Sequence, residues 1–347
     1  MKIENSIFYP SESFEDIQIA ERLIKAYNNT INQDLGVFKT TEGIDDLWSV
    51  ISEHPQIYKL RELLEQNNPL NLSKYLNDFG KEPMWYGGIH LCGLDPLHPF
   101  PLGYDYVCKE ILRLSTSIGL DVYTNDTVDN LIIRLSNYFN FNIVPPPVIP
   151  ISGLKSTSGI IHERHVNSLY FANLIKKYTT PFDNICEYGG GLGLNAFFLY
   201  NMNRLNVYLF DLPFVNVISG YFLIKALGND AVVLEGEQSK RDCIHINAFW
   251  NCNKYSENYF EVTANQDSFP EIDIDILKIY FSIIEHNTKS YFLSINQEHE
   301  SPMFSSSKMH SSVPKIASWF SKLENILRKP YCLRTENNYI EEHYKIN

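Results

Sequence analysis

The chain has 347 residues and a formal net charge of −12, with 44% hydrophobic, 20% charged and 14% aromatic residues. This hydrophobic content can build a sizeable core, which excludes a largely disordered chain, and the length favours one large or two medium domains. The acidic excess argues against nucleic acid as a partner, because nucleic-acid binding depends on Lys and Arg displacing counterions.

The first 150 residues are predicted to be mainly helical. Apolar residues recur at helical spacing over 14–28, 43–66, 107–114 and 128–141, and a stretch rich in Gly, Pro and aromatic residues, 83–106, predicts irregular structure between them. The run VPPPVIP at 144–150 then favours an extended connector, because proline fixes φ and lacks an N–H donor. We therefore expect a helical domain, 1–150, that caps a second domain, 151–347, and contributes to substrate recognition.

After residue 150, short apolar runs alternate with helical segments. The predicted strands are 184–188, 207–210, 231–234, 259–263 and 291–295, and the predicted helices between them are 195–201, 215–227 and 273–285. Such alternation implies crossover connections, and hence an α/β fold in which helices cover both faces of a parallel sheet. The segment 243–253 is considered as an extra strand.

No membrane partner is expected. The longest apolar region, 207–227, contains Asp211 and Lys225, which do not suit a segment that crosses hydrocarbon. The N-terminus carries Glu4 where a secretory peptide would be apolar, so the expected location is cytoplasmic. His162 and His165 lack an evident third ligand, and no metal site is predicted.

The most informative segment is a glycine loop, Gly189-Gly190-Gly191-Leu192-Gly193, placed between a predicted strand and a predicted helix. Glycines there let a ligand approach the backbone at a helix N-terminus. Leu194 stands where a dinucleotide fingerprint needs glycine, and the loop contains no lysine for a nucleoside triphosphate. Glu187 before the loop suits a cationic ligand, and Asp211 at the next strand end is placed for the hydroxyls of a ribose.

These residues resemble class I S-adenosylmethionine-dependent methyltransferases, whose first motif is an E/D-x-G-x-G-x-G loop followed by an acidic residue that ends the second strand. The stretch 265–271, NQDSFPE, and the strand 291–296 are similar to the sugar O-methyltransferase family. The resemblance covers residues 150–347 well and implies a Rossmann-like class I methyltransferase sheet, closed by an antiparallel strand pair at 331–335 and 339–346.

The resemblance also implies a site that binds S-adenosyl-L-methionine and releases S-adenosyl-L-homocysteine. Asp211 would hold the ribose, Leu212 would pack on adenine, and Arg164 would meet the methionine carboxylate. The complete set of predicted cofactor-binding residues is Arg164, Glu187, Gly189, Gly190, Gly191, Gly193, Asp211, Leu212, Asn247, Phe249, Asn265 and Gln266.

Methyl transfer to a neutral hydroxyl needs a base, and the candidates are Asp267 and Glu271 after the fourth strand and His299 and Glu300 after the fifth. The first hypothesis for the acceptor is a hydroxyl of a sugar or glycosylated metabolite. The second is a carboxylate, at a peptide C-terminus or on a small acid, which needs orientation alone because it is already ionised. A binding protein that keeps the fold without the chemistry is the third, and the oligomeric state is left open, with a homodimer considered.

Overall fold

The computed structural model describes residues 5–11, 13–41, 51–81, 88–91, 104–123, 126–203, 206–298, 310–335 and 338–347. Its helices are α1 (Phe14–Ile31), α3 (Pro55–Glu65), α4 (Pro69–Asp78), α5 (Tyr104–Ser117), α6 (Val128–Phe139), α7 (Glu163–Lys176), α8 (Leu194–Asn203), α9 (Pro213–Leu227), α10 (Ile274–Asn287) and α11 (Val313–Ala317), with 3-10 helices η1 (Gly36–Thr41), η2 (Asn229–Ala231), η3 (Phe249–Lys254) and η4 (Phe269–Glu271). Its strands are β1 (Asn5–Phe8), β2 (Ile151–Ser156), β3 (Gly159–Ile161), β4 (Asn184–Tyr188), β5 (Asn206–Asp211), β6 (Val232–Val233), β7 (Ile244–Ala248), β8 (Phe260–Gln266), β9 (Thr288–Gln297), β10 (Leu323–Pro330) and β11 (Tyr339–Ile346). No helix in these ranges is long and apolar enough to cross a membrane.

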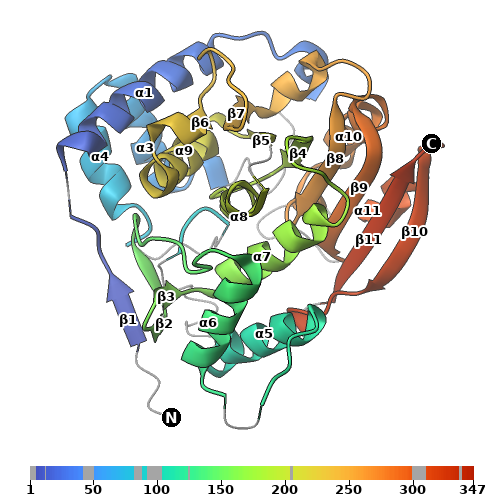
Figure 1. Cartoon of the computed structure of the whole chain (residues 1–347). Helices are drawn as coiled ribbons and strands as arrows, with labels where there is room; N and C mark the ends of the chain where they lie inside the picture. The colour runs from blue at the N-terminus through green and yellow to red at the C-terminus, as the bar shows by residue number, and fades with distance from the viewer. Residues whose placement is uncertain are drawn as a thin grey trace.

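The main sheet has eight strands in the order β10-β11-β9-β8-β4-β5-β7-β6 (Figure 1). Strands β9, β8, β4, β5, β7 and β6 pair in parallel, whereas β11 is antiparallel to both β9 and β10. The chain therefore has the predicted Rossmann-like α/β architecture with a mixed sheet, and the possible extra strand at 243–253 is present as β7.

Successive side chains of each strand point to opposite faces of the sheet, and helices cover both. On β4, Ile185 belongs to a buried cluster with α7, α8 and α9, while Cys186 and Tyr188 belong to a second cluster with α10 and α11. Near the middle of the sheet, where both faces are covered, β5 is buried along its whole length.

Helix α9 explains why part of the N-terminal region packs on the sheet domain. The sequence of α9 is apolar on nearly every side of the helix, so packing only one face against the sheet would leave apolar surface exposed to water. Helix α1 covers the other face, where Leu23 packs so closely that a Cβ on Gly220 would lie 2.7 Å from it. Lys225 of α9 reaches the buried Asp16 of α1 at 2.9 Å, which fixes the two helices in register.

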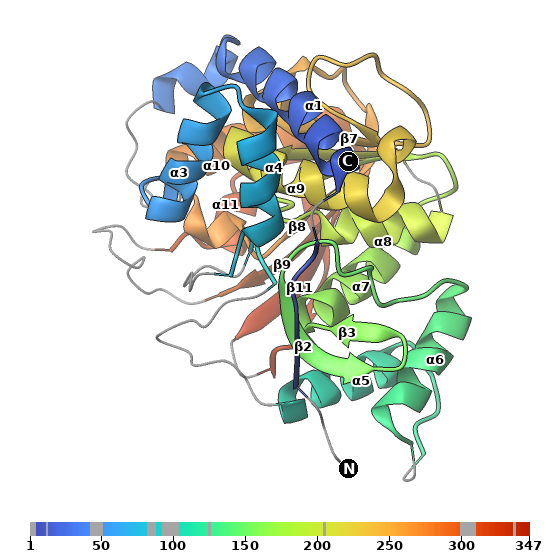
Figure 2. The same cartoon turned by 90° about the vertical axis from the view of Figure 1, so that its left-hand side faces the viewer.

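The other N-terminal helices divide into two groups, as Figures 1 and 2 show. Helices α3 and α4 lie with α1 over α9, while α5 and α6 lie at the opposite end of the molecule beside α7, next to the small sheet β1-β2-β3. One buried cluster runs through residues on both sides of position 150. The region is mainly helical as predicted, and its division from the rest at residue 150 stays a prediction.

Two predicted elements differ from the structure. The helix predicted over 43–66 is interrupted, since α3 begins at Pro55, which has no N–H for a preceding turn, and His54 caps it by accepting from the Gln56 N–H. Residues 42–50 lie outside the described chain. The strand predicted at 331–335 is wrong: β11 pairs instead with 323–330, an edge strand whose exposed polar residues give no apolar alternation.

Candidate functional site

The site lies at the carboxyl ends of three neighbouring parallel strands, β4, β5 and β8. Tyr188, at the end of β4, pairs with Phe210 on one side and with Asn265 on the other. The segments that follow these strands, 189–193, 211–212 and 267–271, therefore meet at one edge of the sheet. In open α/β sheets this edge is where ligands bind.

The loop after β4 needs glycine at specific positions. Gly191 has φ of 53°, and a Cβ there would lie 2.4 Å from the carbonyl oxygen of Gly88. That oxygen accepts a hydrogen bond of 3.1 Å from the Leu192 N–H, so the loop packs directly on the 88–91 segment. Gly189 has φ of 67°, and a Cβ there would collide with the Ser268 side chain. Gly88 on one side of the loop and Ser268 on the other therefore leave no room for a side chain at Gly191 or Gly189.

Two buried carboxylates flank this loop. Asp211 accepts hydrogen bonds from the N–H groups of Gly191, at 2.9 Å, and Leu212, at 2.7 Å. Burial nevertheless raises the pKa of Asp211 to about 7, because the two backbone donors only partly offset the lost hydration.

Glu187 has only one of its oxygens satisfied. Its Oε1 accepts from the Asn195 amide at 2.6 Å, while Oε2 has no hydrogen-bond partner among the described residues. Burial, with a smaller contribution from the charge of Asp211, raises the pKa of Glu187 to about 7. A buried carboxylate oxygen without a donor is costly, and a cationic or donor group of a ligand would relieve that cost.

Two cavities meet at Gly189 and Ser268. The apolar cavity, about 500 Å³ with its opening to solvent, is lined by Tyr188, Gly189, Phe210, Asp211, Leu212, Phe249, Ser268, Ile272, Ile276 and Tyr280. The polar cavity, about 900 Å³ with its opening to solvent, is lined by Gly88, Leu91, Arg164, Asn167, Ser168, Glu187, Gly189, Gly190, Gly191, Leu192, Leu194, Asn195, Gln266, Asp267, Ser268, Glu271, Arg334 and Tyr339. An elongated ligand with one flat apolar end and one charged end would fit across the pair.

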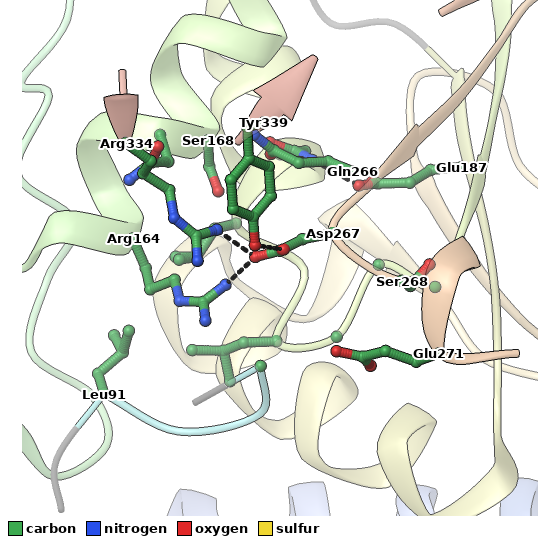
Figure 3. Close-up of a pocket in the computed structure, with 18 residues that line it drawn as sticks. Leu91, Arg164, Ser168, Glu187, Gln266, Asp267, Ser268, Glu271, Arg334 and Tyr339 are labelled. Carbon is green, nitrogen blue, oxygen red and sulfur yellow. Dashed lines mark hydrogen bonds and ion pairs between the residues drawn. The ribbon is translucent and has the colours of Figure 1, made fainter. Parts of the chain in front are cut away.

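Asp267 forms the centre of an ion-paired cluster in the polar cavity (Figure 3). Its Oδ2 accepts from Nη1 of Arg164 at 2.6 Å and from Nη1 of Arg334, and its Oδ1 accepts from the Tyr339 hydroxyl. Burial alone would raise the pKa of Asp267, but the charges of Arg334 and Arg164 outweigh it and hold this pKa below its ordinary value. A carboxylate held in this way is a poor proton acceptor, so the geometry argues against the predicted base role.

The structure brings most of the predicted site residues together. Arg164, Glu187, Gly189, Gly190, Gly191, Gln266, Asp267 and Glu271 line the polar cavity, and Gly189, Asp211, Leu212 and Phe249 line the apolar one. His299 and Glu300 lie outside the described residues.

Three predicted cofactor residues line neither cavity. Gly193 packs against Leu223 of α9. The Asn247 amide donates to backbone carbonyls within the sheet, one of them that of His245. Asn265 is fully buried beneath the loop, where its amide donates to the Ser268 hydroxyl and to a backbone carbonyl. These three residues support the residues that line the cavities but do not line either cavity themselves.

Sequence reasoning missed Arg334 and Tyr339. They reach Asp267 across 67 and 72 positions of chain, and neither belongs to a local motif. His162 and His165 cap α7, and in the described ranges no group of His, Cys, Asp and Glu has the arrangement of a metal site.

Comparison of the sequence with known protein families finds no match, and comparison with curated proteins finds none either. Among solved structures the chain is similar to geranyl diphosphate C-methyltransferase from Streptomyces coelicolor A3(2), at 9% identity and a TM-score of 0.40, over 54% of this chain and 81% of that one. It is also similar to magnesium protoporphyrin IX methyltransferase from Synechocystis PCC 6803, at 8% identity and a TM-score of 0.37, over 52% of this chain and 87% of that one. Similarities this weak do not establish a family, so function is inferred from the site itself.

Proposed function

We propose that this protein is an S-adenosyl-L-methionine-dependent O-methyltransferase whose cofactor lies across the two cavities. The observation that carries the proposal is the pair of buried carboxylates beside the glycine loop, above all Glu187, whose Oε2 has no hydrogen-bond partner in the part of the chain that the structure describes. The methionine part of the cofactor brings an ammonium group that this oxygen would accept from. A dinucleotide would bring a pyrophosphate to the same place, where a carboxylate is unfavourable.

The remaining residues fit the other parts of the same ligand. Leu212 and Phe249 would hold the adenine ring in the apolar cavity, and Asp211 would accept from the ribose hydroxyls. Arg164 has donors left for the methionine carboxylate after its bond to Asp267. When bound, the cofactor supplies a methyl group on a positively charged sulfur, which makes that methyl electrophilic.

The acceptor would then bind in the polar cavity, where the chain supplies orientation and a base. A neutral hydroxyl must lose its proton as its oxygen gains the methyl group. Glu271, at the end of η4, is the predicted base that lines this cavity outside the Asp267 cluster. We therefore assign proton removal to Glu271 and the hydroxyl of a sugar or related metabolite as acceptor.

Methylation of a carboxylate is the second candidate. The observation that favours it is the ion pairing of Asp267, because that bonding leaves fewer bases in the cavity and an ionised acceptor needs none. The two candidates differ in product: mild base releases the methyl group of an ester as methanol, whereas an ether is stable.

The cofactor assignment is tested by calorimetric titration of the full chain with S-adenosylhomocysteine. We expect saturable binding, and a loss of about one to two kcal/mol in Asp211→Ala, the scale of a charge-assisted hydrogen bond. Lys278→Ala, which alters an exposed salt bridge on α10, is the matched control and should bind as the wild type does. Absence of binding, or equal affinity in Asp211→Ala, would refute the assignment.

A further inference from the structure

Arg334 is held in the wall of the polar cavity, beside Arg164 and Tyr339 (Figure 3). Its guanidinium stacks on the ring of Tyr339, 4.1 Å from the centroid, and donates to Asp267. Its backbone N–H is also fixed, because it donates to Oε2 of Glu110 at 3.1 Å. Only 13% of the side chain is exposed, so its position is set by the fold and not by solvent.

The hydrogen-bonding capacity of this guanidinium is mostly unused. An arginine has five N–H donors, and the acceptor that the described residues give to the Arg334 side chain is one oxygen, Oδ2 of Asp267, shared with Arg164. By contrast, Arg328 on the exposed edge strand donates to two carboxylates, Glu298 and Glu342. A fixed, largely buried guanidinium with one shared acceptor is a preformed site for an oxyanion.

The proposed cofactor would not take up these donors. Its ammonium is assigned to Glu187 and its carboxylate to Arg164, whose guanidinium lies beside that of Arg334 on the same oxygen of Asp267. One carboxylate takes one guanidinium fork, which leaves donors of Arg334 for another oxyanion. The cofactor carries a net positive charge, from the sulfonium and ammonium groups against one carboxylate. The polar cavity is lined by Arg164 and Arg334 against Glu187, Asp267 and Glu271, so the wall with the cofactor bound is close to neutral. The case for an anionic acceptor therefore rests on the unused donors of Arg334 and not on the total charge of the site.

We propose that Arg334 binds an oxyanion of the acceptor, so that the substrate is an acidic hydroxyl compound such as a sugar acid or a sugar phosphate. This inference rests on the proposed function, since it places the acceptor beside the cofactor. The oxyanion is the anchor, and the methyl group goes to a hydroxyl that the anchor holds near Glu271. Carboxylate and phosphate both present two adjacent negatively charged oxygens, which a guanidinium fork can bind together.

Asp267 acts in this arrangement as a positioning residue. It orients Arg334 toward the cavity and ties it to Arg164, so that the acceptor-side and cofactor-side arginines keep a fixed separation. Replacement by Asn keeps the shape but removes the charge that holds both guanidinium groups.

The test uses the full chain saturated with S-adenosylhomocysteine and titrated with D-glucuronate, D-glucose 6-phosphate and D-glucose in separate calorimetric runs. We expect one or both acidic sugars to bind more tightly than glucose, and the stronger of the two identifies the oxyanion. Arg334→Gln should weaken that binding by about 10- to 100-fold, the scale of a charge-assisted pair, while Arg334→Lys keeps part of it. Arg328→Gln is the matched control and should bind as the wild type does.

Four outcomes would overturn the inference, and a fifth would instead refute the proposed function. Equal affinity for glucose and both acids, no binding of any of the three, or unchanged acid binding in a folded Arg334→Gln protein would overturn the inference. So would a loss of S-adenosylhomocysteine affinity in Arg334→Gln that Arg164→Gln does not share, because Arg334 would then belong to the methionine site. If the wild type binds no S-adenosylhomocysteine, the proposed function itself fails before the acceptor is tested.

Discussion

Raising the pH from about 6 to about 8 should tighten the binding of S-adenosylhomocysteine, because two buried carboxyl groups must lose protons to serve it. Glu187 and Asp211 both have pKa values raised to about 7 by burial. In the unliganded protein near the lower pH, both groups are therefore largely protonated. An ammonium group beside Glu187 and ribose hydroxyls on Asp211 favour the ionised forms, so binding expels these protons and affinity rises with pH.

The size of the effect follows from the fraction of each group that is ionised. A carboxyl group with a pKa of about 7 is ionised in about 9% of molecules at about pH 6 and in about 91% at about pH 8. Each required carboxylate thus contributes about tenfold in affinity, and the two together about 100-fold, or about 2.7 kcal/mol.

The assay is calorimetric titration across this range, repeated in buffers of different ionisation enthalpy so that released protons are counted. We expect up to about two protons to be released per ligand near the lower pH. Glu187→Gln and Asp211→Asn each remove one titrating group, and each should reduce the pH dependence by about tenfold. An affinity that is constant over the range, or a slope unchanged in both variants, would refute the role given to these carboxylates.

Three further substitutions test other parts of the site. Gly191→Ala places a Cβ 2.4 Å from the Gly88 carbonyl oxygen, so it should lower the melting temperature by several degrees and weaken cofactor binding. Gly119→Ala is the control, because Gly119 has φ of 78° and no atom near its Cβ, so that substitution adds backbone strain alone. Equal shifts of the melting temperature in both variants would contradict the close packing at Gly191. Phe249→Ala should weaken S-adenosylhomocysteine binding by about tenfold through lost ring contact, measured by the same titration, and unchanged affinity would place adenine elsewhere. Asp267→Asn should lower the free energy of unfolding in urea by about 2 kcal/mol, less than for a fully buried pair, because two largely buried guanidinium groups lose their shared counter-charge. An unchanged urea midpoint would show that the cluster does not stabilise the fold.

The parts of the site that the sequence predicts well are local. The glycine loop, Glu187 and Asp211 lie within 25 positions of one another, at the carboxyl ends of two strands that are visible as apolar runs. Because the carboxyl ends of parallel strands meet at one edge, identifying the strands was enough to bring these residues together. The resemblance to class I methyltransferases predicts Leu212 beside adenine, and the possible strand at 243–253 predicts Phe249 there; both line the apolar cavity.

The parts that could not be predicted depend on distant contacts or on the absence of a pattern. Arg334 reaches Asp267 only because β11 is inserted beside β9, and nothing near Arg334 in the chain marks it. Strand 323–330 is an exposed edge, so its polar residues carry no alternation, while Tyr331 and Leu333 after it are apolar because they are buried beside the helices. A prediction from apolar runs therefore shifted the strand past its true end.

The most direct test of the account is the crystal structure of the full chain with S-adenosylhomocysteine bound. We expect adenine in the apolar cavity against Leu212 and Phe249, ribose hydroxyls on Asp211, and the ammonium group within hydrogen-bond distance of Glu187 Oε2. A ligand bound away from the glycine loop, or one whose ammonium group leaves Oε2 of Glu187 without a donor, would contradict it.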